Sequence, residues 1–146
     1  MIVLDTSILV GAFISFSKDR HDIGTTLIDL ISDRGLDIYE PQLLPIELSG
    51  VLVRYKPRDV VKEHINEVIR FINLVDCEEF HNIALEVALS TGCRAVDAFF
   101  IACAKKTKSI LISNDKTQVT SARRAGVETY HLLGEYEKVL KKLRES

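Results

Sequence analysis

The sequence predicts an α/β fold in which helices flank a central, mostly parallel sheet of about five strands. Short runs of β-branched and other apolar residues alternate with longer segments of helical periodicity. The connections are short, and 146 residues with 47% hydrophobic content suffice for one well-packed core. Because no repeat, linker or low-complexity segment divides the chain, we expect a single domain over residues 1–146.

The first strand is predicted at residues 2–4, where three apolar residues precede an acid. A helix is expected over 6–16, because apolar side chains continue at helical spacing. The charged segment 18–22 is expected to form a loop. It precedes a second helix over 23–35, which a glycine ends.

The next predicted strand, 36–41, ends at a proline and leads into a helix over 42–55. An amphipathic helix over 56–72 follows, with Pro57 at its head. The remaining chain continues the alternation of strands and helices. Its predicted elements are a strand at 73–78, helices at 82–92 and 94–106, a strand at 109–115, a helix at 116–126, a strand at 127–132 and a helix at 134–146.

Four acids interrupt otherwise apolar segments, namely Asp5, Glu47, Asp97 and Asp115. An ionised carboxylate in apolar surroundings is costly unless a positive or hydrogen-bonding partner compensates it. Asp5 and Asp115 end predicted parallel strands, at the sheet edge where open α/β folds bind ligands. Asp97 and Glu47 would face that edge from flanking helices. Four converging carboxylates would repel one another, so we expect them to bind hard cations, Mg²⁺ or Mn²⁺.

Each acid also has a structural interpretation. The first and last precede predicted helices and could cap them. The third could complement a helix dipole in a first turn. Glu47 could pair with a basic residue such as Arg54 or Arg94.

Polar side chains adjoin the first and last acids. They are Thr6, Ser7, Ser113 and Asn114. We expect them to orient the carboxylates or their bound waters. Helix capping explains Thr6 and Ser7 equally well.

No apolar run approaches the roughly 18 residues that a membrane span requires. The three cysteines form no CxxC pair, which argues against a disulfide framework and a thiolate zinc site. We therefore expect a cytoplasmic protein without a membrane segment. The net charge of -2 neither indicates nor excludes a nucleic-acid ligand.

Four stretches, "VLDTSIL", "PIELSGVL", "AVDAFFIACA" and "LISND", resemble in order and spacing the acidic motifs of the PIN domain ribonucleases. The compact length is similar to that of the VapC-type toxins. The resemblance implies a three-layer fold and a metal-dependent endoribonuclease, with the four acids as catalytic and metal-binding residues and Ser113 beside the last. One departure is that residues 116–126 contain no further acid, where many relatives place one.

The resemblance also implies an RNA substrate, an antitoxin partner and a homodimer. Clustered basic residues could then hold the RNA backbone. They are Arg54, Lys56, Arg58, Lys105, Lys106, Arg123 and Arg124. Any of them could instead belong to a solvated face.

Two alternatives remain at this point. One is a non-catalytic PIN-like module that binds RNA or protein, and the other is an RNA-processing nuclease that is not a toxin. Phosphatases of the haloacid dehalogenase type would need DxD after the first strand, where this chain has "DTS". A response-regulator receiver would need an early acidic pair and a late lysine after a strand, and neither is clear here.

Overall fold

The structure is a computed structural model of the chain and describes residues 1–15 and 17–146. Its strands are β1 (Ile2–Leu4), β2 (Tyr39–Pro41), β3 (Asn73–Val75), β4 (Ile110–Ser113) and β5 (Thr129–His131). Its helices are α1 (Thr6–Phe13), α2 (Lys18–Asp33), α3 (Leu44–Leu52), α4 (Arg58–Phe71), the short 3₁₀ helix η1 (Cys77–Phe80), α5 (His81–Thr91), α6 (Ala95–Thr107), α7 (Lys116–Arg124) and α8 (Tyr136–Arg144).

The strands pair in parallel, in two groups. Three form a sheet in the order β1-β4-β5, and β2 pairs with β3. A single parallel bridge between Ile2 and Ile38 joins the two groups. The predicted five-stranded parallel arrangement is confirmed, with a split between β1 and β2 that the sequence did not predict.

A buried side chain crosses this split. The Leu4 backbone N–H donates to Glu40 Oε1 at 2.7 Å, so a carboxyl oxygen takes the place of a strand carbonyl. Glu40 is fully buried, and its Oε2 atom has no hydrogen-bond partner. Burial raises the pKa of Glu40 well above its usual range, because a charge there would lose its hydration.

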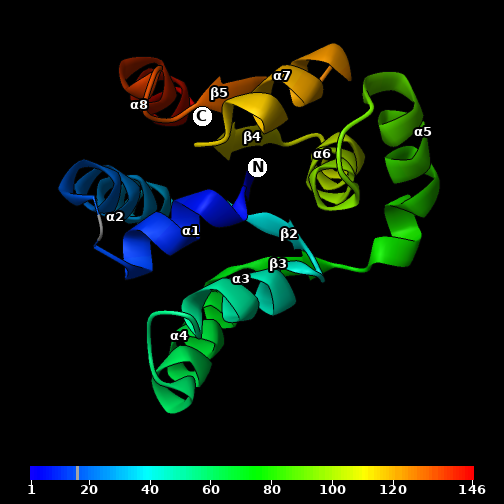
Figure 1. Ribbon diagram of the computed structural model, residues 1–146. Helices are drawn as coiled ribbons and strands as arrows, with labels where there is room; N and C mark the ends of the chain where they lie inside the picture. Colours follow the sequence, from blue (N-terminus) through cyan, green and yellow to red (C-terminus); the bar gives the residue numbers. More distant parts are fainter. Residues whose placement is uncertain (16) are drawn as a thin grey trace.

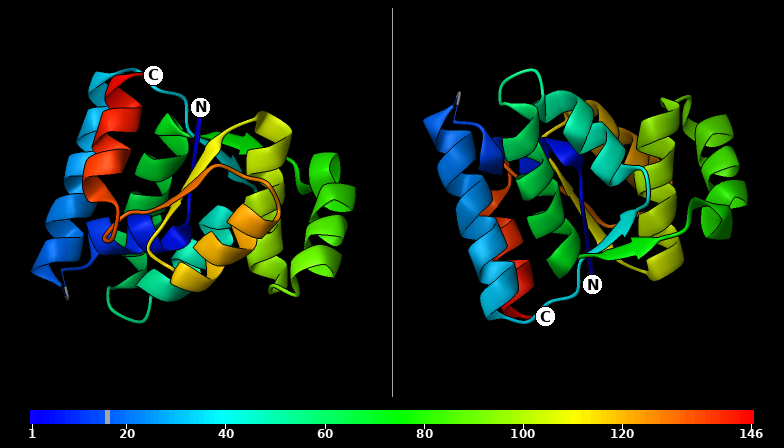
Figure 2. Two further views of the ribbon diagram at one scale, coloured as in Figure 1. Left: turned by 90° about the horizontal axis from the view of Figure 1, so that it is seen from above. Right: turned by 90° about the horizontal axis from the view of Figure 1, so that it is seen from below.

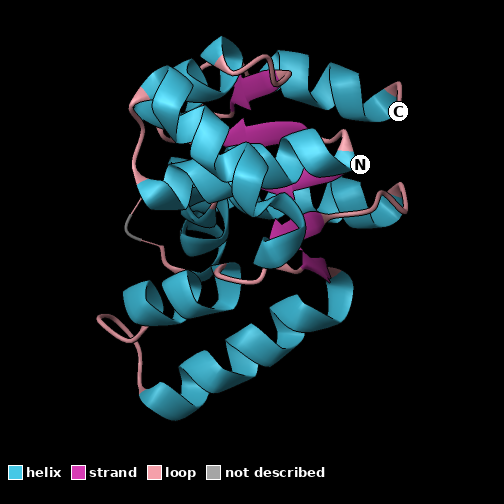
Figure 3. Ribbon diagram, turned by 90° about the vertical axis from the view of Figure 1, so that its right-hand side faces the viewer, coloured by secondary structure: helices cyan, strands magenta, loops and turns pink. Residues whose placement is uncertain are grey.

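Helices cover both sides of the strands, as the expected three layers require (Figures 1 and 2). In Figure 1, α1, α2 and α8 lie on one side and α5 and α6 on the other, while α3, which packs against α1 and α4, lies with α4 below the β2-β3 pair. Figure 3 shows the strands enclosed between these helical layers. Helix α1, which follows Asp5, and helix α6, which carries Asp97, therefore approach the sheet from opposite faces.

Helix α6 is largely buried, with all residues from Asp97 to Ala104 except Phe99 removed from solvent. Within the described part of the chain, no single helix is long and apolar enough to span a membrane. The segment Cys77–Thr91, formed by η1 and α5, together with α6 meets the length and composition that a membrane span needs, but the two helices are bent by 119° relative to each other.

The predicted loop at 18–22 is wrong, because α2 begins at Lys18. Ser17 caps the helix through a hydrogen bond from Arg20 N–H to its Oγ at 3.4 Å, and Asp19 adds a negative charge to the first turn. The first helix ends at Phe13, three residues earlier than expected. The end of that predicted helix, residue 16, lies outside the described residues.

Candidate functional site

The first and last acids follow neighbouring strands at one edge of the sheet. Asp5 comes directly after β1, and Asp115 follows β4 by two residues. Both cap a helix: Asp5 Oδ2 accepts from Ser7 N–H at 3.2 Å, and Asp115 Oδ1 accepts from Thr117 N–H at 2.9 Å. The capping interpretation is therefore correct, and it holds together with the position at the ligand-binding edge.

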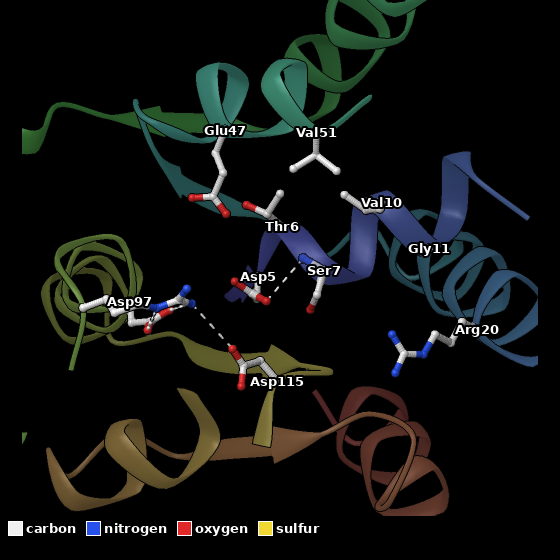
Figure 4. Close-up of a pocket in the computed structure, with 11 residues that line it drawn as sticks. Asp5, Thr6, Ser7, Val10, Gly11, Arg20, Glu47, Val51, Asp97 and Asp115 are labelled. Carbon is white, nitrogen blue, oxygen red and sulfur yellow. Dashed lines mark hydrogen bonds and ion pairs between the residues drawn. The ribbon is translucent and has the colours of Figure 1, made fainter. Parts of the chain in front are cut away.

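All four acids line one cavity of about 280 Å³ (Figure 4). Asp97 reaches it from α6 and is 4% exposed, whereas Glu47 faces it from α3. The other lining residues are Thr6, Ser7, Val10, Gly11, Arg20, Val51 and Arg94. Four acids from four separate segments thus meet around a single space.

Hydroxyl groups connect the two strand ends. Ser113 Oγ donates to Asp5 Oδ2 at 3.1 Å and accepts the Asp115 backbone N–H at 2.9 Å. Ser7 Oγ accepts the Asn114 backbone N–H at 3.1 Å. These bonds tie the Asp5 carboxylate to the backbone that carries Asp115, whereas the Asn114 side chain takes no part in them.

The electrostatics of the cavity favour protonation of two acids. Burial is the main cause that raises the pKa of Asp5 and of Glu47, and repulsion from Asp97 raises both further. Hydrogen bonds from Ser7 oppose the shift at Asp5 only in part. The Thr6 hydroxyl lies toward Glu47 and opposes its shift, although the two groups do not reach full hydrogen-bond geometry.

Arg94 supplies positive charge to the side of the cavity where Asp97 and Asp115 lie. Its Nε donates to Asp97 Oδ2 at 3.1 Å, and its Nη2 lies 3.4 Å from Asp97 Oδ1 and 3.7 Å from Asp115 Oδ2. The sequence suggested Arg94 only as one partner for Glu47. Its position three residues before Asp97, within one helical turn, is the signal that could have revealed this ion pair.

The donor chemistry suits a hard divalent cation, since every acid offers carboxylate oxygen. Glu47 Oε2 and Thr6 Oγ1 are buried without a partner, so both can still accept an interaction. Among the described residues, however, no three His, Cys, Asp or Glu side chains are close enough together to hold a metal ion. A cation bound by Asp97 must therefore compete with Arg94 and draw the other carboxylates inward.

The basic residues predicted to contact RNA do not line this cavity among the residues described. They are Arg54, Lys56, Arg58, Lys105, Lys106, Arg123 and Arg124. Four have partners elsewhere. Lys105 Nζ donates to a backbone carbonyl at 2.8 Å, and Arg123 pairs with Glu135 at 2.6 Å. Lys56 Nζ lies 3.3 Å from His64 Nε2, and Arg124 Nη2 donates to a backbone carbonyl at 3.5 Å. Sequence reasoning proposed no RNA contact for the arginines that do line it, Arg20 and Arg94. Arg20 belongs to segment 18–22, which was predicted as a loop and instead forms the start of α2.

The parallel α/β architecture and the acid-lined cavity at the carboxyl edge of β1 and β4 define a class of domain with a carboxylate site. Within this class, the family model of the PIN domain matches residues 2–123. The chain belongs to the PIN domain family, and the resemblance seen in its four motifs is confirmed.

Solved structures share this fold. FitAcB from Neisseria gonorrhoeae has a TM-score of 0.67 at 20% identity, over 89% of this chain and 96% of that one. VapBC2 from Rickettsia felis, bound to a DNA fragment from its promoter, has a TM-score of 0.67 at 15% identity, over 89% and 98%. PAE2754 from Pyrobaculum aerophilum has a TM-score of 0.65 at 16% identity, over 99% and 90%. No curated protein matches the chain by sequence.

Proposed function

We propose that this protein is a metal-dependent endoribonuclease that hydrolyses RNA phosphodiester bonds, with Asp5, Glu47, Asp97 and Asp115 as its catalytic and metal-binding residues. The observation that carries the proposal is the meeting of these four acids around one cavity, where Glu47 Oε2 is buried and unpaired. Membership of the PIN domain family supports the nuclease class.

The four acids would bind Mg²⁺ or Mn²⁺, which when bound would activate water and stabilise negative charge on the phosphate. The rest of the site prepares that binding. Ser113 holds Asp5 and Asp115 in register across the two strands. Thr6 and Ser7 add polar groups to the cavity wall, and the Asn114 backbone N–H donates to Ser7 Oγ from outside that wall. Arg94, once displaced from Asp97, remains beside the cavity to pair with a phosphate oxygen.

The test is cleavage of labelled single-stranded and structured RNAs with Mg²⁺ or Mn²⁺, and with EDTA, by wild type and Asp97→Asn. We expect cleavage that requires both the metal and Asp97. Cleavage that persists in chelator would exclude the metal mechanism, and unchanged cleavage by Asp97→Asn would remove that residue from the site.

We propose further that the protein acts in the cytoplasm as the toxin of a toxin-antitoxin pair, as a homodimer of a single-domain chain over 1–146. The structural likeness to VapBC2 supports this context. An RNA-processing role outside such a pair would use the same chemistry. Survival of cells that express the protein, compared with cells that express Asp97→Asn, distinguishes a toxin from a processing enzyme.

A second candidate is a non-catalytic PIN-like module that binds RNA or protein. The observation in its favour is the Arg94–Asp97 ion pair, which already neutralises one acid without a metal. A folded wild type that binds RNA but cleaves no member of the panel would support this alternative.

A further inference from the structure

Two arginines line the acidic cavity, and their surroundings differ. Arg94 is engaged by Asp97 and Asp115, whereas the Arg20 guanidinium forms no hydrogen bond or ion pair with the residues that the structure describes. Figure 4 shows Arg20 at the far end of the cavity from Asp97, with its guanidinium directed inward. An exposed guanidinium without a partner among the described residues thus lies at the end of the cavity away from Asp97.

The packing of α1 against α2 determines where Arg20 lies. A Cβ atom at Gly11 would lie 3.5 Å from the Arg20 carbonyl oxygen and 3.7 Å from Arg20 Cβ, so the helices touch at this point. Gly24 allows a second close approach of the two helices, because a Cβ atom at Gly24 would lie 3.4 Å from the Ile8 carbonyl oxygen. Because Asp5 caps the start of α1 and Gly11 lies six residues later, this contact is about 9 Å along the helix from the acid end.

The fold itself gains nothing from a positive charge at this position. Arg20 lies in the first turn of α2, where the helix dipole disfavours a cation. Its backbone N–H provides the capping bond to Ser17, and any side chain would preserve that bond. Replacing the guanidinium is therefore expected to leave the stability of the domain unchanged or slightly raised.

We propose that Arg20 binds a backbone phosphate of the RNA beside the phosphate that is cleaved. This inference rests on the proposed function. The acids would hold the scissile phosphate through a bound cation, and an RNA strand that follows α1 would bring the neighbouring phosphate to Arg20. A guanidinium offers two parallel N–H donors to phosphate oxygens, which explains an arginine at a position where the helix does not favour one.

The experiment measures RNA affinity in an Asp97→Asn background, which is expected not to cleave the RNA. The chain that keeps Arg20 is compared with Arg20→Gln, Arg20→Lys and Lys18→Gln in this background. Lys18→Gln is the matched control, because it removes one exposed charge from the same helical turn and does not line the cavity. We expect Arg20→Gln to weaken binding of single-stranded RNA about tenfold or more. The slope of log K against log salt should fall by about 0.7, the value for one lost phosphate contact on a single strand. Arg20→Lys should restore the slope but only part of the affinity.

Cleavage kinetics add a second measurement. In the chain with Asp97 intact, Arg20→Gln should raise KM and leave kcat within about twofold, because the lost contact holds the ground state and the transition state alike. Lys18→Gln should change neither constant appreciably.

The inference is overturned if Arg20→Gln leaves affinity and salt slope unchanged, or if Lys18→Gln weakens binding equally. It is also overturned if Arg20→Gln weakens only the binding of an acidic protein partner. Wild type that cleaves RNA with no dependence on Arg20 would leave the proposed function in place. Wild type that binds RNA through Arg20 but never cleaves it would overturn the nuclease and retain the phosphate contact.

Discussion

Replacement of Glu40 tests how the split in the sheet is held together. The fully buried Glu40 Oε1 accepts a hydrogen bond from the Leu4 backbone N–H at 2.7 Å. Leu4 directly precedes Asp5, the first of the four acids. Glu40→Gln keeps a carbonyl oxygen for this bond and places an NH₂ group where the unpaired Oε2 lies. Glu40→Met fills a similar volume but leaves the Leu4 N–H unsatisfied. A buried donor without a partner costs about 1–3 kcal/mol, and the unpaired NH₂ of glutamine carries such a cost as well. Glu40→Met should therefore be less stable than Glu40→Gln by no more than this amount.

The pH dependence separates charge burial from the hydrogen bond. Burial raises the pKa of Glu40 in the folded state above its ordinary value of 4.5. As pH rises above 4.5, the unfolded chain loses this proton first, so wild-type stability falls until the pH passes the folded pKa. Glutamine does not titrate. The free energy of unfolding of Glu40→Gln relative to wild type should therefore rise steadily from pH 4.5 upward.

The assay is urea denaturation and thermal unfolding between pH 4 and 8 in EDTA, which keeps metal from the acids of the cavity. For a domain of this size about 1 kcal/mol corresponds to roughly 2–4 °C in melting temperature. Glu40→Met should thus melt below Glu40→Gln by no more than roughly 12 °C. Identical pH profiles for wild type and Glu40→Gln would refute the buried, proton-retaining carboxyl. Greater stability of Glu40→Met than of Glu40→Gln would refute the role of the hydrogen bond.

Further predictions concern the cavity. Asp97→Asn should abolish metal-dependent RNA cleavage and shift the melting temperature little; cleavage at the wild-type rate would contradict this. Added Mn²⁺ should stabilise the wild type by about 2.7 kcal/mol at a hundredfold excess over Kd, measured as a rise in melting temperature; a flat titration would mean that the acids do not bind it. Arg94→Gln should tighten Mn²⁺ binding in calorimetry, because the guanidinium competes for Asp97; weaker binding would assign Arg94 a supporting role. Because burial raises the pKa of Asp5 and Glu47, Mn²⁺ affinity should increase from pH 5 to 7; a pH-independent affinity would contradict proton competition.

The errors in the sequence-based prediction have identifiable causes. Residues 18–22 are charged and were assigned to a loop, although Ser17 followed by an acid is a helix start signal. Arg20 lies in this segment, and the start of α2 at Lys18 places it on a helix beside the cavity. The basic clusters were chosen by composition alone, and composition does not tell whether a lysine faces a cavity or, like Lys105, a backbone carbonyl.

Local pattern suffices to predict the parallel α/β architecture and to single out the four acids as candidates. Apolar runs of strand length alternate with helical periodicity, and an acid directly after a parallel strand must lie at the carboxyl edge. The hydrogen bonds and ion pairs that compensate the acids depend instead on tertiary packing. The Ser113 bond to Asp5 joins residues 108 positions apart, and the Glu40 bond to Leu4 joins residues 36 apart. The approach of Arg20 to the cavity depends on two helices meeting at glycines. Such contacts arise from packing between distant segments, which no local pattern encodes.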